Sequence, residues 1–327
     1  MKRNKKRLVA TGVAGFILVF SFIFNGNDKS SVNKDENAAS SFQSVESLIN
    51  GEVKATKKVL KTGDSSQVIQ KISIKDEIGA AMIDKESDSS VLNQIKKAKE
   101  DSNVKAILLA VDSPGGGVYE SREIYEALKN SGKDVYVTME SQAASGGYYV
   151  AMAGKKIFAH QETITGSLGV IRAGVTAQEF FNKNGIKAQI IRSGDQKAVG
   201  GPFEELNEEA IKIYEDINTE VFNRFIDVIA EGRNMSKDDV RKLADGRIYT
   251  ANQALGHKLI DKIASEEDMI NEIKNEKGLS NPQVIEYKGP ASSTNFLNSF
   301  VSETAKAISK EVTKAATSSN FEMKYLG

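Results

Sequence analysis

The sequence predicts an α/β fold with a largely parallel sheet whose strands are joined by helical crossovers. Two observations support this prediction. The run VKAILLAVD, Val104 to Asp112, is continuously apolar, as is typical of a strand buried on both faces of a sheet. Around this run, helix-like and strand-like periodicities alternate along the chain. In such sheets, functional groups gather at the carboxyl ends of the strands.

Local periodicity predicts the elements in order, beginning with a strand near residue 72. Ile72 and Ile74 alternate there with polar residues, although Gln70 breaks the alternation. An amphipathic helix follows at 91–100, with apolar side chains at helical spacing. After the buried strand, we expect a helix at 119–132, a strand at 134–139, a helix within 143–153, a strand at 155–159, a turn at 163–170, a helix at 176–182, a strand at 186–192 and a long helix at 206–231.

The composition argues against several kinds of chemistry. The chain has 44 basic and 44 acidic residues, so its charge gives no reason to expect nucleic acid as a partner. It contains no cysteine, which excludes a thiol nucleophile, a disulfide and a thiolate metal ligand. With only two histidines, His160 and His257, a histidine metal cluster is not expected either. We therefore predict neither a metal nor another cofactor.

The N-terminus combines positive charge with a long uncharged run. MKRNKKR has five cationic residues, and the 17 residues from Leu8 to Phe24 carry no charge. That length is close to the lower limit of about 17 residues for a membrane-spanning helix. No small-x-small cleavage site follows, so an uncleaved anchor is favoured over a removed signal peptide. The positive-inside rule then predicts a cytoplasmic N-terminus and an extracytoplasmic remainder.

Two glycine-rich segments follow neighbouring predicted strands. SPGGG, residues 113–117, lacks the lysine of a Walker loop and the spacing of a dinucleotide fingerprint. Its bare N–H groups suit a phosphate or a developing oxyanion, with a simple tight turn as the alternative. One strand later, Ser145 lies between alanines and glycines in SQAASGGYY. A helix cap explains the serine, but its small neighbours indicate room for a substrate backbone, so the two segments together favour acyl transfer with Ser145 as nucleophile.

A serine nucleophile requires a general base, and two candidates remain open. His160 follows a predicted strand and forms a Ser-His triad if an acid such as Glu162 supports it. Lys197 lies in SGDQKAVGGPF, a loop of small residues after the strand predicted at 186–192. Burial favours the uncharged form of a lysine, which then accepts the serine proton and returns it to the leaving amine. His257 is the weakest candidate because it lies near a predicted helix end.

Four ordered motifs, VDSPGGGVYES, SQAASGGYYVAMA, TITGSLGV and SGDQKAVGGPF, resemble the signal peptide peptidase A (protease IV) family, of the short, single-repeat type. The resemblance runs from about Ile72 to Ile263. It implies the fold shared by Clp protease and crotonase, and a Ser-Lys dyad. Ser145 matches the family's nucleophile and Lys197 its general base.

The resemblance implies further assignments. Ser167 falls where the family places a hydroxyl that orients the lysine, and the N–H groups of Gly116 and Gly146 correspond to an oxyanion hole. The family also implies a ring or dome homo-oligomer with active sites at protomer interfaces, and substrates that are remnant signal peptides or other extended apolar peptides. The expected segments are a cytoplasmic basic segment (1–7), a transmembrane anchor (8–24), a polar tether (25–67), the catalytic peptidase domain (68–290) and a C-terminal tail with one amphipathic helix (291–327).

Three alternatives stay open on the sequence alone. The residues His160-Gln161-Glu162 depart from the family pattern ahead of TITGS, which keeps the Ser-His hydrolase as an alternative. A crotonase-like reaction on an acyl thioester would use the same glycine amides for an enolate. A non-enzymatic oligomeric scaffold on the cell surface would need none of these groups for catalysis.

Overall fold

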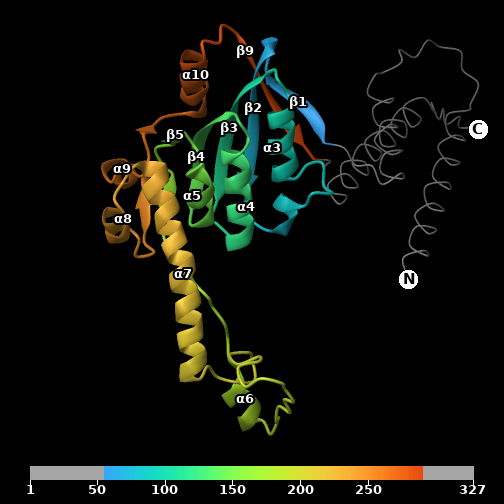
Figure 1. Ribbon diagram of the computed structural model, residues 1–327, viewed down its shortest axis with the longest axis vertical. Coiled ribbons are helices and arrows are strands. Elements are labelled where there is room, and N and C mark those ends of the chain that lie inside the picture. Colours follow the sequence, from blue (N-terminus) through green and yellow to red (C-terminus); the bar gives the residue numbers. More distant parts are fainter. Residues whose placement is uncertain (1–54, 290–327) are drawn as a thin grey trace, which may run out of the picture. The chain divides into compact units, whose positions relative to one another are not determined.

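The computed structural model describes residues 55–289, and its sheet is largely parallel, as predicted (Figure 1). The strand order is β1-β9-β2-β3-β4-β5-β8, with β6 paired to the end of β4 and β7 paired to β6. The pairs β1–β9 and β6–β7 are antiparallel, and the others are parallel. The strands are β1 (Thr56–Lys61), β2 (Asp64–Lys75), β3 (Val104–Ser113), β4 (Asp134–Ala144), β5 (Lys156–Ala159), β6 (Ile164–Gly166), β7 (Ile248–Thr250), β8 (Lys262–Ile263) and β9 (Pro282–Lys288).

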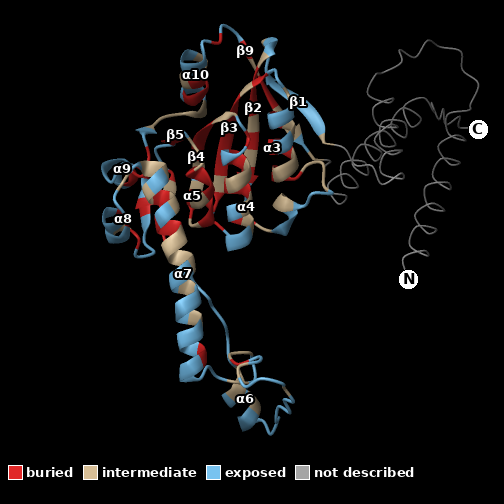
Figure 2. Cartoon of the chain, viewed as in Figure 1, coloured by how far each residue is buried: buried red, intermediate tan, exposed pale blue. Residues whose placement is uncertain are grey.

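Helices cover both faces of the sheet, which explains why its central strands are apolar on both sides (Figure 2). Buried side chains of α3, α4, α5 and α7 share one core with the sheet, whereas α10 forms a second core on the other face. The helical elements are η1 (Ala80–Ile83), α3 (Val91–Glu100), α4 (Val118–Lys129), α5 (Gly146–Ala151), α6 (Gln178–Lys183), α7 (Glu208–Arg233), α8 (Lys237–Leu243), α9 (Ala251–Gly256) and α10 (Glu266–Lys277).

Three expectations differ from the structure. Strands begin at Thr56, so β1 and the start of β2 fall within the stretch expected to be a tether, 25–67. Residues 164–166, expected within a turn, form β6 because they pair with the end of β4. Residues 186–192, expected as a strand, have no partner strand in the described part of the chain and are irregular. Their apolar alternation lacks the ladder of hydrogen bonds that makes a strand.

The expected membrane anchor, residues 8–24, lies outside the described residues, as do the basic segment 1–7 and the tail 291–327. Within residues 55–289, no helix has the length and apolar character needed to cross a membrane.

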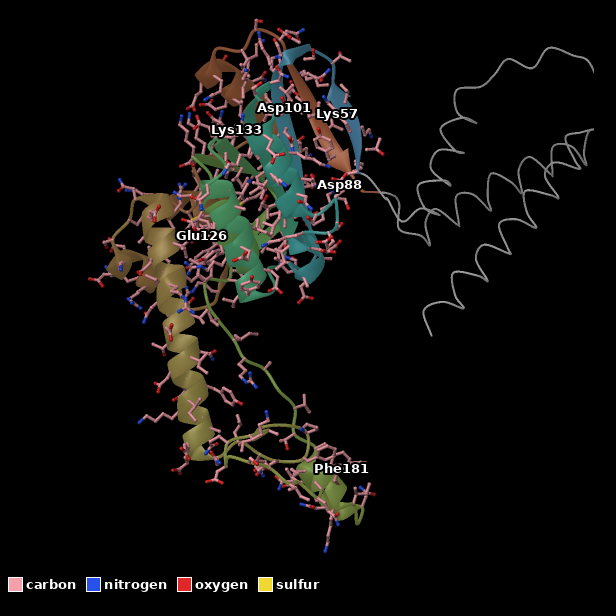
Figure 3. The ribbon with its side chains drawn as sticks, turned by 45° about the vertical axis from the view of Figure 1, so that its right-hand side comes forward. Lys57, Asp88, Asp101, Glu126, Lys133 and Phe181 are labelled. Atoms are coloured by element: carbon pink, nitrogen blue, oxygen red, sulfur yellow. The ribbon has the colours of Figure 1, made fainter. Side chains whose placement is uncertain are left out.

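The longest helix of residues 55–289, α7, carries a distal lobe formed by residues 172–207, which includes α6 (Figure 1). Phe181 of this lobe lies away from the sheet region of Asp101 and Lys133 (Figure 3). The lobe is held together by a stacked pair, Phe181 and Phe203, with ring centroids 5.0 Å apart. At its other end, α7 packs against α5 through Phe225 and Tyr149, whose ring centroids are 5.3 Å apart.

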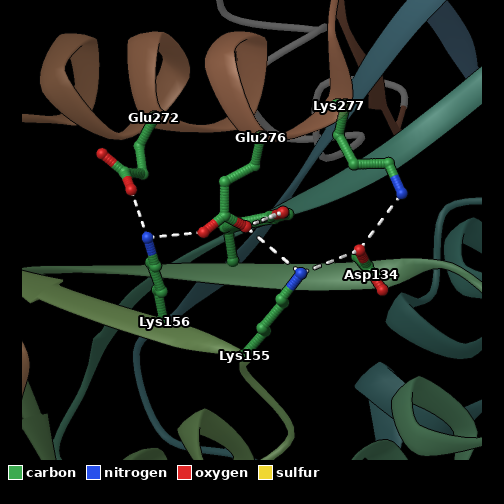
Figure 4. Close-up of polar contacts among 7 residues, drawn as sticks. Asp134, Lys155, Lys156, Glu272, Glu276 and Lys277 are labelled. Carbon is green, nitrogen blue, oxygen red and sulfur yellow. Dashed lines mark hydrogen bonds and ion pairs between the residues drawn. The ribbon is translucent and has the colours of Figure 1, made fainter.

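The α10 helix is fastened to the sheet by a network of charged groups (Figure 4). Glu276 accepts a hydrogen bond of 2.7 Å from the hydroxyl of Tyr136 and pairs with Lys156 at 2.5 Å and Lys155 at 3.2 Å. Lys156 also pairs with Glu272. The Lys156 ammonium first, and then the Tyr136 hydroxyl, lower the pKa of Glu276 from 4.5 to about 2. The network therefore favours the ionised carboxylate of Glu276.

Glu276→Gln is expected to lower the free energy of unfolding at pH 7 by about 1–2 kcal/mol, since the partners of Glu276 are partly exposed and screened by solvent. The pKa of Glu276 is lower in the folded state than in the unfolded state. Its contribution is therefore complete above about pH 4.5 and is lost as the pH falls toward 2. Urea unfolding at several pH values should show that the difference in free energy of unfolding between Glu276→Gln and the parent protein becomes smaller as the pH falls. Glu220→Gln, at an exposed position, is the matched control. A free-energy difference between Glu276→Gln and the parent protein that does not change with pH would contradict the lowered pKa of Glu276.

Candidate active site

Ser145 occupies the turn between β4 and α5 at the carboxyl end of a central strand. Its backbone has φ 53° and ψ −120°, a conformation that non-glycine residues rarely adopt. The turn is held by a hydrogen bond of 2.8 Å from the Ser145 N–H to the carbonyl of Gly166. Backbone strain of this kind costs about 1–3 kcal/mol and gathers at functional sites. Ser145 therefore has the backbone setting of a functional residue.

The hydroxyl of Ser145 does not cap the helix that it precedes. The side chain makes no capping hydrogen bond to α5, although Ser145 is the N-cap residue. Other polar N-cap residues in the described chain do accept a backbone N–H, namely Ser90, Asn207, Ser236, Thr250 and Ser265. The capping explanation for this serine is therefore not supported, and its hydroxyl is available for other chemistry.

The glycine loop after β3 lies against the Ser145 turn. A Cβ added to Gly115 would lie 2.8 Å from the Ser145 Cβ and 2.7 Å from the Gly146 nitrogen. A Cβ added to Gly146 would lie 3.2 Å from the Gly116 nitrogen. Within residues 55–289, no acceptor pairs with the N–H of Gly116 or Gly146. Two unpaired backbone donors thus lie beside the serine, an arrangement that suits a developing oxyanion.

Two serines that the sequence did not single out shape this loop. Ser113 accepts the Gly115 N–H at 3.1 Å and donates to the carbonyl of Asp76 at 2.5 Å. Ser121 donates to the carbonyl of Gly117 at 2.8 Å, one turn into α4. Both are buried. A serine four residues after a glycine at a helix start is the signal that could have identified Ser121, since that spacing places both on one helix face.

Ser167 follows β6 directly, beside the turn that carries Ser145. Strands β4 and β6 are parallel with Ala144 opposite Gly166, so the two serines follow paired positions. Ser167 also has a left-handed φ of 51°, and its N–H donates to the carbonyl of Arg247 at 2.7 Å. Sheet pairing therefore brings the two hydroxyl-bearing residues to the same edge.

The two histidines lie elsewhere. His160 is exposed at the end of β5, where its N–H bonds to the carbonyl of Met139, six residues before Ser145 on β4. No hydrogen bond joins His160 to Ser145 or Glu162 in the described chain. His257 ends α9 and packs edge-on against Tyr249. The described residues also hold no group of three or more acidic or histidine side chains placed to bind a metal.

Lys197 does not meet Ser145 within one chain. Its loop is fixed to the start of α7 by a 2.6 Å hydrogen bond from Gln196 to Glu209, whereas the Ser145 helix contacts α7 at Phe225. These two points are 16 residues apart on one helix, or about 24 Å along its axis at 1.5 Å per residue. Lys197 is exposed at the distal lobe. Within the described residues, Lys197 is therefore not placed to act on the Ser145 of its own chain.

Comparisons with known proteins identify the family and the fold. A model of peptidase family S49 matches residues 127–280, and a model of Clp protease matches residues 63–164. The second match covers β2 to β5 and identifies the fold as Clp-protease-like α/β with a mixed sheet.

Individual relatives share the same region. The putative signal peptide peptidase SppA of Enterococcus faecium is 36% identical over 91% of this chain and 88% of its own length. Protease 4 of Haemophilus influenzae is 33% identical over 59% of this chain, but only 33% of its own length is covered. The chloroplastic serine protease SPPA of Arabidopsis thaliana is 32% identical over 53% of this chain and 26% of its own length.

Proposed function

Because this chain belongs to peptidase family S49 and is a serine peptidase, we propose that Ser145 is its nucleophile and Lys197 its general base. The single observation that carries the proposal is the Ser145 turn. There, a hydroxyl that makes no helix-capping bond lies beside two unpaired glycine N–H groups. Among the groups of the described chain, this pairing is the one suited to attack on a peptide carbonyl.

The proposed reaction is peptide hydrolysis through an acyl-enzyme. The Ser145 oxygen attacks the scissile carbonyl while the Lys197 amine takes its proton, and the N–H groups of Gly116 and Gly146 stabilise the oxyanion. The lysine then gives the proton to the leaving amine. A water molecule then attacks the acyl-enzyme carbonyl while the lysine amine takes its proton. The lysine returns that proton to the Ser145 oxygen as the acyl group leaves as a carboxylic acid. In this proposal, the hydroxyl of Ser167, which lies beside Ser145, orients the lysine amine.

A neighbouring copy of the chain supplies Lys197 in this proposal. The separation of about 24 Å along α7 supports this, because a lysine side chain reaches only a fraction of that length. Burial against another chain also favours the uncharged lysine that a base requires. The distal lobe, together with Ile171 directly before it, exposes large apolar side chains, as expected of an interface. Those in the lobe include Val175, Phe180 and Ile191. In a closed ring or dome, every Ser145 site receives Lys197 from a neighbouring copy.

The proposed substrates are remnant signal peptides and other extended apolar peptides. The name of the Enterococcus faecium relative, a putative signal peptide peptidase, supports this substrate class. Residues 8–24 would anchor the chain in the cell membrane with the catalytic domain on the extracytoplasmic side, as their uncharged length suggests. Cleavage would then take place where signal peptides remain after export.

Gly146→Ala tests the oxyanion assignment and hence the proposed function. An added Cβ would lie 2.5 Å from the Ser121 oxygen and 3.2 Å from the Gly116 nitrogen, so it should force the two donors apart. We expect hydrolysis of an apolar peptide amide and phosphonylation of Ser145 to slow by about 10²–10³-fold. Combining it with Ser121→Ala removes the closer contact and should restore part of the rate.

Gly256→Ala is the matched control, because a Cβ there meets no atom within 4 Å. Its rate should equal that of the parent protein. Parent-like phosphonylation and hydrolysis in Gly146→Ala would contradict the proposed function. So would phosphonylation of a residue other than Ser145 in the parent protein, read by peptide mass spectrometry.

A further inference from the structure

The loop that carries Lys197 has little regular structure to fix it. Residues 194–201 form successive turns, with bonds such as Lys197 N–H to the Gly194 carbonyl at 3.1 Å. A lysine side chain is long and flexible. A loop that presents a catalytic lysine to another chain therefore needs an additional restraint on its backbone.

Arg192 provides such a restraint. Its Nη1 donates to the carbonyls of Asp195 and of Lys197, at 3.2 and 3.1 Å. Its Nη2 donates to both carboxylate oxygens of Glu204, at 2.8 and 2.7 Å. The planar guanidinium thus joins the loop on one side to the segment before α7 on the other.

This contact differs from an ordinary surface ion pair. The Arg192 side chain is 23% exposed and that of Glu204 is 30% exposed, whereas the pair Lys183–Glu179 in the same lobe is 74% and 76% exposed. Exposed single pairs contribute little to stability. Arg192 instead holds the peptide carbonyl of Lys197 itself, so it fixes the point from which the lysine side chain leaves the backbone.

We propose that Arg192, held by Glu204, is a positioning residue for the catalytic lysine. The inference rests on the proposed role of Lys197 as general base. Without the guanidinium, the loop keeps its other attachments to α7, which are the Gln196–Glu209 bond of 2.6 Å and the Tyr214 hydroxyl near the Val199 carbonyl at 3.5 Å. The lobe therefore stays folded, but the lysine loses its fixed direction. A displacement of about 1 Å at a reacting group costs up to about 10²-fold in rate.

The test compares three variants of the assembled full-length protein in the hydrolysis of a fluorogenic apolar peptide amide. Arg192→Gln should lower kcat by about 10–100-fold and leave KM within about twofold, because the proposed role of Arg192 is to direct the lysine and not to contact the substrate. Glu204→Gln should lower kcat less, since the carbonyl contacts of Arg192 remain. Reversing the pair, Arg192→Glu with Glu204→Arg, restores an ion pair but places no guanidinium at residue 192, so kcat should stay low.

Lys183→Gln is the matched control for loss of one positive charge in the lobe and should behave as the parent protein. Native mass spectrometry of each variant should show the parent assembly. Recovery of kcat in the reversed pair would overturn the inference, as would a parent-like kcat in Arg192→Gln when Lys197→Ala is inactive. Loss of assembly in both single variants would also overturn it by showing a structural role. A parent-like rate in Lys197→Ala would instead refute the proposed function.

Discussion

Ser145→Ala is expected to lower peptide hydrolysis by about 10⁴–10⁶-fold, as removal of a nucleophile does in serine peptidases. The hydroxyl makes no capping bond to α5, so its loss should leave the free energy of unfolding within about 0.5 kcal/mol of the parent value. The rate should be measured on an apolar peptide amide, and stability by urea unfolding. Ser141→Ala, at an exposed position on the same strand, is the control and should retain the parent rate.

Ser145→Gly separates catalysis from strain. Glycine adopts the backbone angles of residue 145, φ 53° and ψ −120°, at low cost. This variant should be as inactive as Ser145→Ala but more stable by about 1 kcal/mol. A Ser145→Gly variant less stable than Ser145→Ala, or peptide hydrolysis by either variant, would contradict the account of a strained nucleophile.

Lys197→Ala is expected to lower the rate by about 10²–10⁴-fold, the usual contribution of a general base. In the parent protein the rate should rise toward alkaline pH, because the amine must lose its proton to act. The residual rate of the variant should lose that dependence. Lys187→Ala, which removes another exposed lysine of the same lobe, is the control. A parent-like rate in Lys197→Ala together with inactivity in His160→Ala would favour the histidine instead.

The sheet and its active edge follow from local sequence patterns. The apolar run that begins at Val104 forms β3, and the alternation at Ile72 and Ile74 forms part of β2. Parallel strands place their carboxyl ends at one edge, so the sequence alone is enough to predict that SPGGG and Ser145 meet there. Gln70 breaks the alternation, yet it is buried in β2 and donates to the carbonyl of Gln94. The amide N–H of this core residue thus has a partner that the local pattern does not reveal, whereas its Oε1 is buried without one among the described residues.

The distal lobe could not be predicted in the same way. Residues 186–192 have the composition of a strand, but strand formation depends on a partner that local alternation does not specify. The distance of Lys197 from Ser145 depends on α7, since the position of the loop along that helix is set by a contact between Gln196 and Glu209. The role of Arg192 is hidden from the sequence for the same reason. Its four hydrogen bonds join residues that are close only after the loop has folded.

The most direct test of the central claim, a dyad formed by two copies of the chain, is complementation between inactive variants. Ser145→Ala and Lys197→Ala, carrying different tags, should be co-expressed and the mixed assembly purified through both tags. If a neighbour supplies the lysine, some sites combine an intact Ser145 with an intact Lys197, and about a quarter of the parent activity should return for random mixing in a closed ring. Mixed assemblies that remain as inactive as the separate variants would contradict the account.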